Sequence, residues 1–259
     1  MGSLSPRLQH LRRTLADIDP NLGPQFCEQA RGVRLGVGAI DAALGGGLAC
    51  GVLHELAPVA PIHLAATTGF AMGLAARSSG TSGTVLWIAT DFAAREGGGP
   101  YGPGLDLFGL AAERLVMLRV PRAVDVLWAM EEALRCRALT AVIAELAEDV
   151  ADLTAARRLT LAAREGAGFG LLLRHRVSAA PSSAVTRWRV SASLSEPDEF
   201  GGLGRTRFEL ALVKNRRGPC GRWIIEWDHH ECIFRAPLSV AVAQTAFDRP
   251  DRAPAVRTG

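Results

Sequence analysis

Lysine is almost absent from this sequence of 259 residues, in which Lys214 is the single example. A phosphate loop of the form G-x-x-x-x-G-K-[ST] needs a lysine that reaches the phosphates and glycines that let backbone N–H groups wrap them. Such a loop would lie in the strand–loop–helix stretch from Gly51 to Arg77. There the loop is APVAPIHLAA, which contains two prolines and neither glycine nor lysine. The sequence therefore excludes an ordinary phosphate loop.

Cysteines are few and scattered, and long apolar runs are missing. The five cysteines form no C-x-x-C pair, which is typical of reduced thiols in a cytoplasmic protein. No apolar run approaches the length that spans a bilayer, and the net charge of +3 is too small to identify a partner. We therefore predict a cytoplasmic protein that makes no membrane contact.

A metal site is the next possibility that the sequence disfavours. Cys220, His229, His230 and Cys232 are close in the chain, but their spacing fits no common structural zinc site. Alternation along a strand would also point the two histidines to opposite faces. Surface histidines and a core cysteine are the favoured interpretation, and we expect neither a metal nor another cofactor.

Apolar strands alternate with helical segments through most of the chain, which indicates βαβ units and a parallel sheet. After Arg174 the helices end, and three further strands are predicted as antiparallel hairpins at one edge. The predicted fold is thus α/β: a mostly parallel sheet flanked by helices, with antiparallel strands at the C-terminal edge. The predicted strands are Val52–Leu56, Thr84–Thr90, Leu115–Val120, Thr140–Leu146, Phe169–Leu173, Thr186–Leu194, Arg205–Asn215 and Arg222–Asp228.

Three regions are predicted along the chain: an N-terminal helix and linker (1–24), an α/β core (25–235) and a flexible C-terminal tail (236–259). Leucines at positions 4, 8, 11 and 15 give Leu4–Ala16 an apolar stripe at helical spacing. Two interpretations of this helix stay open. It either packs back on the core or serves as an arm that docks a partner.

Glu145 nearly ends the fourth predicted strand, where RecA-type ATPases carry an acid that binds Mg²⁺. The strand ends in Ala-Glu-Leu rather than in the usual aspartate–serine pair. A degenerate nucleotide site is therefore expected near Pro58, Pro61, His63 and Glu145, without catalytic residues and without ATP hydrolysis.

Basic residues are concentrated between Arg174 and Arg222, where ten basic and four acidic side chains give a net charge of +6. Arg187 and Arg189 flank Trp188 and share one strand face by the period of two. A cationic face with an aromatic ring suits single-stranded nucleic acid. The alternative is a solvated sheet edge protected by charge. The candidate DNA-binding residues are Arg174, Arg176, Arg187, Trp188, Arg189, Arg216 and Arg217.

Three segments together resemble the ImuA family, the inducible mutagenesis proteins, which are sometimes grouped with SulA-like proteins. The segments are LGVGAIDAALGGGLACGVLHEL, REGGGPYGPGLDLFGL followed by ERLVMLR, and LLLRHRVSAAPSSAVTRWRVSA. The first also resembles the entry to the RecA recombinase core, which implies a RecA-like, mostly parallel sheet flanked by helices and a RecA-like core over residues 25–235.

The resemblance implies a non-catalytic adaptor in SOS-induced, error-prone translesion synthesis. Its implied partners are an ImuB-type polymerase-like protein and an error-prone polymerase of the replicative type, with RecA and single-stranded DNA as further candidates. Two rival functions stay open: a RecA/KaiC-like ATPase with an unorthodox phosphate loop, and a SulA-type inhibitor of cell division.

Overall fold

The computed structural model describes residues 32–197, 202 and 204–237. The predicted helix Leu4–Ala16, its linker and residues 238–259 of the predicted tail lie outside the described residues. A small sheet of β1 (Gly32–Val33) and β2 (Leu48–Ala49) leads into the main sheet.

The main sheet has nine strands in the order β11-β10-β9-β8-β3-β7-β6-β4-β5. The six strands from β8 to β5 are parallel, and β9, β10 and β11 continue the sheet in antiparallel fashion. The predicted α/β class with an antiparallel C-terminal edge is therefore confirmed. The strands are β3 (Val52–Pro58), β4 (Thr84–Thr90), β5 (Leu115–Val120), β6 (Leu139–Leu146), β7 (Phe169–Arg174), β8 (Thr186–Ala192), β9 (Arg207–Asn215), β10 (Gly221–Asp228) and β11 (Ile233–Arg235).

One detail of that prediction needs correction. The strand at Thr186 was expected to belong only to antiparallel hairpins, but β8 pairs in parallel with β3 on one side and antiparallel with β9 on the other. The strand is joined to β7 by the crossing segment 175–185, so it runs in the same direction as its neighbours β3 and β7. β8 is thus the junction between the two parts of the sheet.

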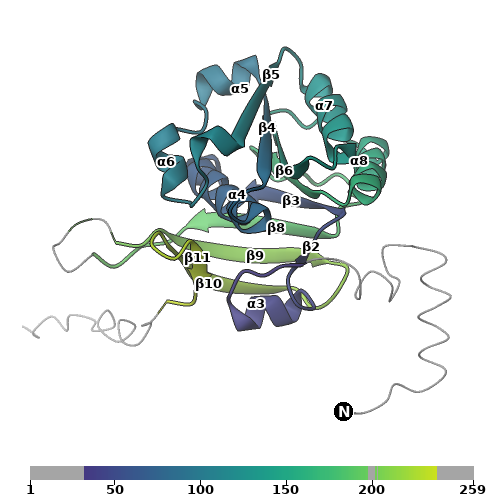
Figure 1. The fold of residues 1–259 in the computed structure, drawn as a ribbon. Coiled ribbons are helices and arrows are strands. Elements are labelled where there is room, and N and C mark those ends of the chain that lie inside the picture. The colour runs from purple at the N-terminus through teal and green to yellow at the C-terminus, as the bar shows by residue number, and fades with distance from the viewer. Residues whose placement is uncertain (1–31, 198–201, 203, 238–259) are drawn as a thin grey trace, which may run out of the picture.

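Helices cover both faces of the parallel part (Figure 1). α4 packs on one face, and α7 and α8 lie together on the other. The helices are α3 (Gly38–Ala43), α4 (Leu64–Ser79), α5 (Asp91–Glu96), α6 (Gly102–Asp106), α7 (Ala123–Arg135) and α8 (Leu153–Gly166), with short 3₁₀ turns η1 (Pro61–His63) and η2 (Ala112–Arg114).

Two hydrophobic cores form because alternate residues of a buried strand point to opposite faces. On β6, Ala141 and Ile143 belong to the core under α4, whereas Val142 and Ala144 belong to the core under α7 and α8. The core under α4 continues across the same face of the antiparallel strands β9, β10 and β11. There, apolar residues of the segment 32–50 pack against it.

The region after β4 differs from the sequence prediction. The stretch DFAAREGGGPYGPGL after Thr90 is rich in glycine and proline, so the sequence predicts a loop there, followed by a short helix at Leu105–Leu110. Instead α5 begins directly at Asp91, because the Thr90 hydroxyl caps it by accepting from Ala93 N–H at 3.1 Å. The next helix, α6, begins three residues earlier than predicted. Pro103 lies in its first turn, where a missing N–H costs nothing.

Candidate functional site

The carboxyl ends of β3, β4, β6 and β7 surround a cleft of about 650 Å³. Open α/β sheets bind their ligands outside the carboxyl ends of the strands, so a nucleotide would lie here. Apolar side chains line much of the cleft, among them Leu64 at the start of α4, Phe92 in α5 and Val177 after β7. Glu148 and Arg176 add opposite charges. The cleft is large enough for a ligand or for several side chains.

The connection from β3 to α4 takes the place of a phosphate loop. Pro58 and Pro61 have no N–H, and the N–H of Val59 already donates to a carbonyl of β8 at 3.0 Å. The ring of His63 accepts from a backbone N–H at the end of β8 at 3.2 Å. The connection is therefore tied to the neighbouring strand, and Pro58, Val59 and Pro61 have no free N–H to offer a phosphate.

Glu145 lies at the end of β6, at the position predicted for the acid of a degenerate nucleotide site. The carboxylate is buried, and both of its oxygens are engaged. Trp87 Nε1 on β4 donates to Oε2 at 3.1 Å, and His175 Nε2 lies 2.6 Å from Oε1. Glu145 thus fastens β4 and the segment after β7 to β6. A Mg²⁺ ion would have to compete with both contacts for it.

A second buried carboxylate, Glu55, was not identified as a site residue from the sequence. It lies on β3 with 2% of its surface exposed, and its oxygens accept from Ser182 Oγ at 2.6 Å and from Arg187 Nε at 2.7 Å. Arg174 Nη2 is 3.4 Å away. Burial by itself raises the pKa of Glu55, but the Arg174 charge and the hydrogen bonds from Ser182 and Arg187 together lower that pKa below its ordinary value.

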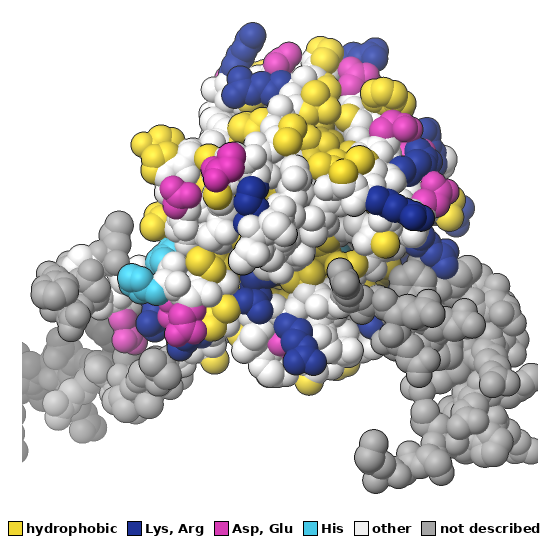
Figure 2. Space-filling view, viewed as in Figure 1, with side chains coloured by type: hydrophobic (Ala, Val, Ile, Leu, Met, Phe, Trp, Pro, Cys, Tyr) yellow, Lys and Arg dark blue, Asp and Glu magenta, His cyan; other side chains and the backbone are white. Residues whose placement is uncertain are grey.

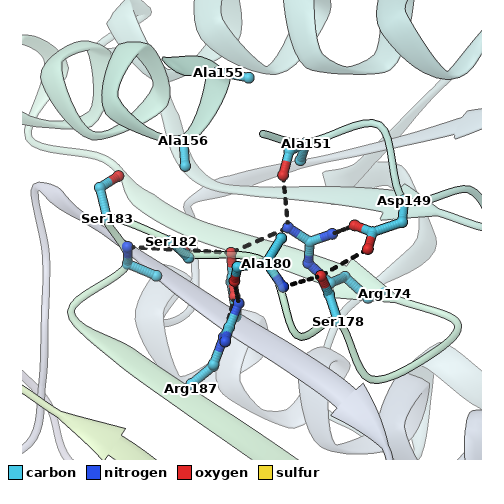
Figure 3. Close-up of polar contacts among 12 residues, drawn as sticks. Asp149, Ala151, Ala155, Ala156, Arg174, Ser178, Ala180, Ser182, Ser183 and Arg187 are labelled. Carbon is cyan, nitrogen blue, oxygen red and sulfur yellow. Dashed lines mark hydrogen bonds and ion pairs between the residues drawn. The ribbon is translucent and has the colours of Figure 1, made fainter. Parts of the chain in front are cut away.

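This network fixes the segment that joins β7 to β8 (Figure 3). Arg174 points to the loop before α8, where it donates to Asp149 at 2.6 Å and to the Ala151 carbonyl at 3.3 Å. Arg187 reaches the Ala180 carbonyl at 2.8 Å, and Ser178 donates to Asp149 at 2.7 Å. The guanidinium groups of Arg174 and Arg187 therefore hold the protein together.

The predicted DNA-binding set does not form one surface. Trp188 is 1% exposed and packs against Phe70 and Trp223, so it is a core residue and the prediction that it belongs to a DNA-binding face is wrong. The prediction fails for Arg174 as well, because its charge is buried and paired with Glu55 and Asp149. α4 covers the face of β8 that carries Trp188, which the strand pattern alone did not determine.

The remaining basic residues of the set lie in three places. Arg176 lines the cleft, and Arg189 is exposed on the face of β8 that α4 does not cover. Arg216 and Arg217 follow β9 near the start of β8, where Arg216 N–H donates to the Val185 carbonyl at 3.0 Å. Arg189 has a cationic neighbour two strands away on its own face: the register aligns it with Ala211 on β9 and Arg222 on β10.

His54 forms a buried chain of hydrogen bonds beside this network. Its Nε2 lies 2.9 Å from the Ala49 carbonyl and its Nδ1 lies 2.7 Å from the Thr186 hydroxyl, which also accepts from Trp188 Nε1 at 2.9 Å. An imidazole that donates through Nε2 and accepts at Nδ1 is neutral. Burial lowers the pKa of His54 to about 4. A histidine in an apolar strand carried no sequence signal for this role.

Two further findings concern metals and membranes. Within the described ranges, no group of three His, Cys, Asp or Glu residues is placed to hold a metal ion. No helix in the same part of the chain has both the length and the apolar character needed to cross a bilayer.

Comparison with known proteins identifies the family. No protein-family model matches the chain. Protein ImuA from two strains of Caulobacter vibrioides is 32% identical to it over an alignment of 202 residues, which covers 70% of this chain and 77% of the relative. The likeness thus extends over most of both proteins. The chain belongs to the ImuA family, which associates it with DNA-damage-induced mutagenesis.

Proposed function

We propose that this protein is a cytoplasmic, non-catalytic accessory protein of SOS-induced, error-prone translesion synthesis. It docks an ImuB-type polymerase-like protein and an error-prone polymerase of the replicative type, with RecA as a further partner. Membership of the ImuA family supports the pathway. One observation of the fold carries the non-catalytic part: the β3–α4 connection has no lysine, has two prolines and is hydrogen-bonded to β8.

The two rival functions have less support. A RecA/KaiC-like ATPase needs converging donors for the phosphates, and it needs an acid free to hold Mg²⁺. Pro58, Val59 and Pro61 in the β3–α4 stretch have no free N–H, and both oxygens of Glu145 are engaged by Trp87 and His175. A SulA-type division inhibitor has no support from the comparison, in which the relatives carry the name ImuA.

The docking claim is tested by co-purification. The purified full-length protein is incubated separately with the ImuB-type protein, the error-prone polymerase, RecA and a cell-division protein from the same organism. We expect retention of the first two, with RecA as the weaker candidate. Retention of the division protein alone would contradict the proposal.

Single-strand binding is a second candidate function, and it now depends on fewer residues. Arg189 and Arg222 lie on one sheet face with two strand spacings between them, roughly 10 Å. Within the described residues no helix covers this face, where Val213 and Ile224 are 44% and 41% exposed. Two guanidinium groups and apolar side chains suit a weak, salt-sensitive contact with a nucleic-acid strand.

Charge reversal tests this candidate. The Arg189→Glu/Arg222→Glu variant is expected to lose most affinity for a fluorescent single-stranded oligonucleotide at low salt. An Arg157→Glu/Arg158→Glu variant on α8 is the control with the same change in net charge. Equal affinity in the two variants would remove single-strand binding from the account.

A further inference from the structure

The cleft at the carboxyl edge of the sheet has the surface of a docking site for protein. Phe92 lines it and is 63% exposed. Ile62, which lies in the chain beside the lining residue Pro61, is 86% exposed. Phe92 and Val177 both line the cleft, with 63% and 41% of their surfaces exposed, and a concave apolar surface of this kind usually has a covering partner.

The charges of the cleft disfavour a phosphate and favour a cationic occupant. Its lining carries three carboxylates, those of Glu96, Glu148 and Asp149, against two guanidinium groups, those of Arg174 and Arg176. Asp149 is paired with Arg174, but Glu96 and Glu148 are exposed and form no ion pair within the described residues. An occupant with apolar side chains and positive charge would satisfy both features.

The chain itself contains such a segment outside the described residues. Residues 1–16 include Arg7, Arg12 and Arg13 and no acidic residue, and the four leucines of Leu4–Ala16 recur at helical spacing. The C-terminal residues 238–259 are a poorer match. They carry three arginines against two aspartates, and they have no comparable leucine stripe.

The connecting chain is long enough for this segment to reach the cleft. Residues 17–31 separate it from β1 and span up to about 50 Å when extended. β1 pairs with β2, which leads into the amino end of β3. The cleft is at the other end of β3, a strand of seven residues, or about 23 Å.

We infer that the segment Leu4–Ala16 docks as an amphipathic helix in the cleft at the carboxyl edge of the sheet, where a nucleotide would lie in an ATPase. Its leucines contact Phe92, Ile62 and Leu64, and its arginines face Glu96 and Glu148. A segment of the same chain thus occupies the position that a nucleotide would take in an ATPase. This inference is independent of the proposed partners.

Hydrogen–deuterium exchange on the full-length protein tests the inference. We expect amides 4–16 to exchange at least about tenfold more slowly in the wild type than in an Ile62→Asp/Phe92→Asp variant. Both substituted side chains are exposed, so the fold tolerates the change. Leu161→Asp, at a 55% exposed position on α8, is the matched control and is expected to keep the protection.

Three results would overturn the inference. The first is fast exchange of amides 4–16 in the wild type, and the second is protection that survives in the cleft variant. The third is protection that disappears on dilution, since that would place the segment on a second copy of the chain. Loss of protection in residues 238–259 instead would assign the cleft to the C-terminal segment.

Discussion

Glu55 and Arg187 lie opposite each other on the parallel strands β3 and β8, and Arg187 Nε donates to Glu55 Oε2 at 2.7 Å. This contact joins β3 to β8, the strand at the junction between the parallel and antiparallel parts of the sheet. It also gives Arg187, which the sequence analysis proposed as a DNA-binding residue, a structural role inside the protein.

The first prediction concerns this contact. Glu55→Ala leaves Arg174 and Arg187 without their buried partner, which we expect to lower the free energy of unfolding by about 3–5 kcal/mol. Arg189→Ala, two positions along β8 from Arg187 and exposed, is the control, with an expected change within about 0.5 kcal/mol. Urea unfolding measures both. Similar urea midpoints for the two variants would mean that the Glu55 network contributes little to the free energy of unfolding.

The second prediction concerns pH. The pKa of His54 is about 4 in the folded protein against an ordinary value of 6.5, so the unfolded chain binds more protons between these two values. Stability is therefore expected to fall by about 3 kcal/mol as pH drops from 6.5 to 4. In a His54→Gln variant, which has no titrating ring, the slope in this window should largely disappear. Parallel stability–pH curves for the two proteins would contradict this assignment.

Below that window Glu55 adds a separate loss. Its folded pKa lies below the ordinary value of 4.5, so its contribution is present above pH 4.5 and is lost as the pH falls through the folded value. A Glu55→Gln variant is expected to show a shallower decline below pH 4.5 than the wild type. If stability declines equally in both proteins below pH 4.5, carboxylates other than Glu55 cause that decline.

The fourth prediction compares two tryptophans. Trp188→Ala empties a buried site and is expected to cost about 3–5 kcal/mol of stability, whereas Trp128→Ala on α7, where the ring is 63% exposed, should cost less than about 1 kcal/mol. Figure 2 shows hydrophobic side chains gathered over β5 and α7, the region of Trp128. Denaturant unfolding of both variants measures the two losses of stability. A stable Trp188→Ala variant with impaired oligonucleotide binding would restore the stacking hypothesis.

Much of the fold could be predicted because its signals are local. Thr84–Thr90 is an unbroken apolar run between turn residues, and its predicted bounds equal those of β4. α5 was missed because Thr90, its cap, was assigned only to the strand before it.

The candidate site was less predictable, since it depends on pairings between distant parts of the chain. Strand alternation correctly placed Arg187 and Arg189 on one face and Trp188 on the other. It did not show that α4 buries the Trp188 face, or that β3 brings Glu55 beside Arg187. Glu55 and Arg187 are 132 residues apart, so no local pattern links them. The position of Glu145 at the end of its strand was predicted correctly, but its contacts with Trp87 and His175 were not.

In the proposed function the cleft at the carboxyl edge of the sheet does not hydrolyse ATP. Release of phosphate from ATP is measured for the purified protein, with and without Mg²⁺, and for a Glu145→Gln variant. We expect no release above background in either protein, because Pro58, Val59 and Pro61 offer a phosphate no free N–H and Glu145 is held by Trp87 and His175. Mg²⁺-dependent turnover by the wild type that is lost in the folded Glu145→Gln variant would contradict this expectation.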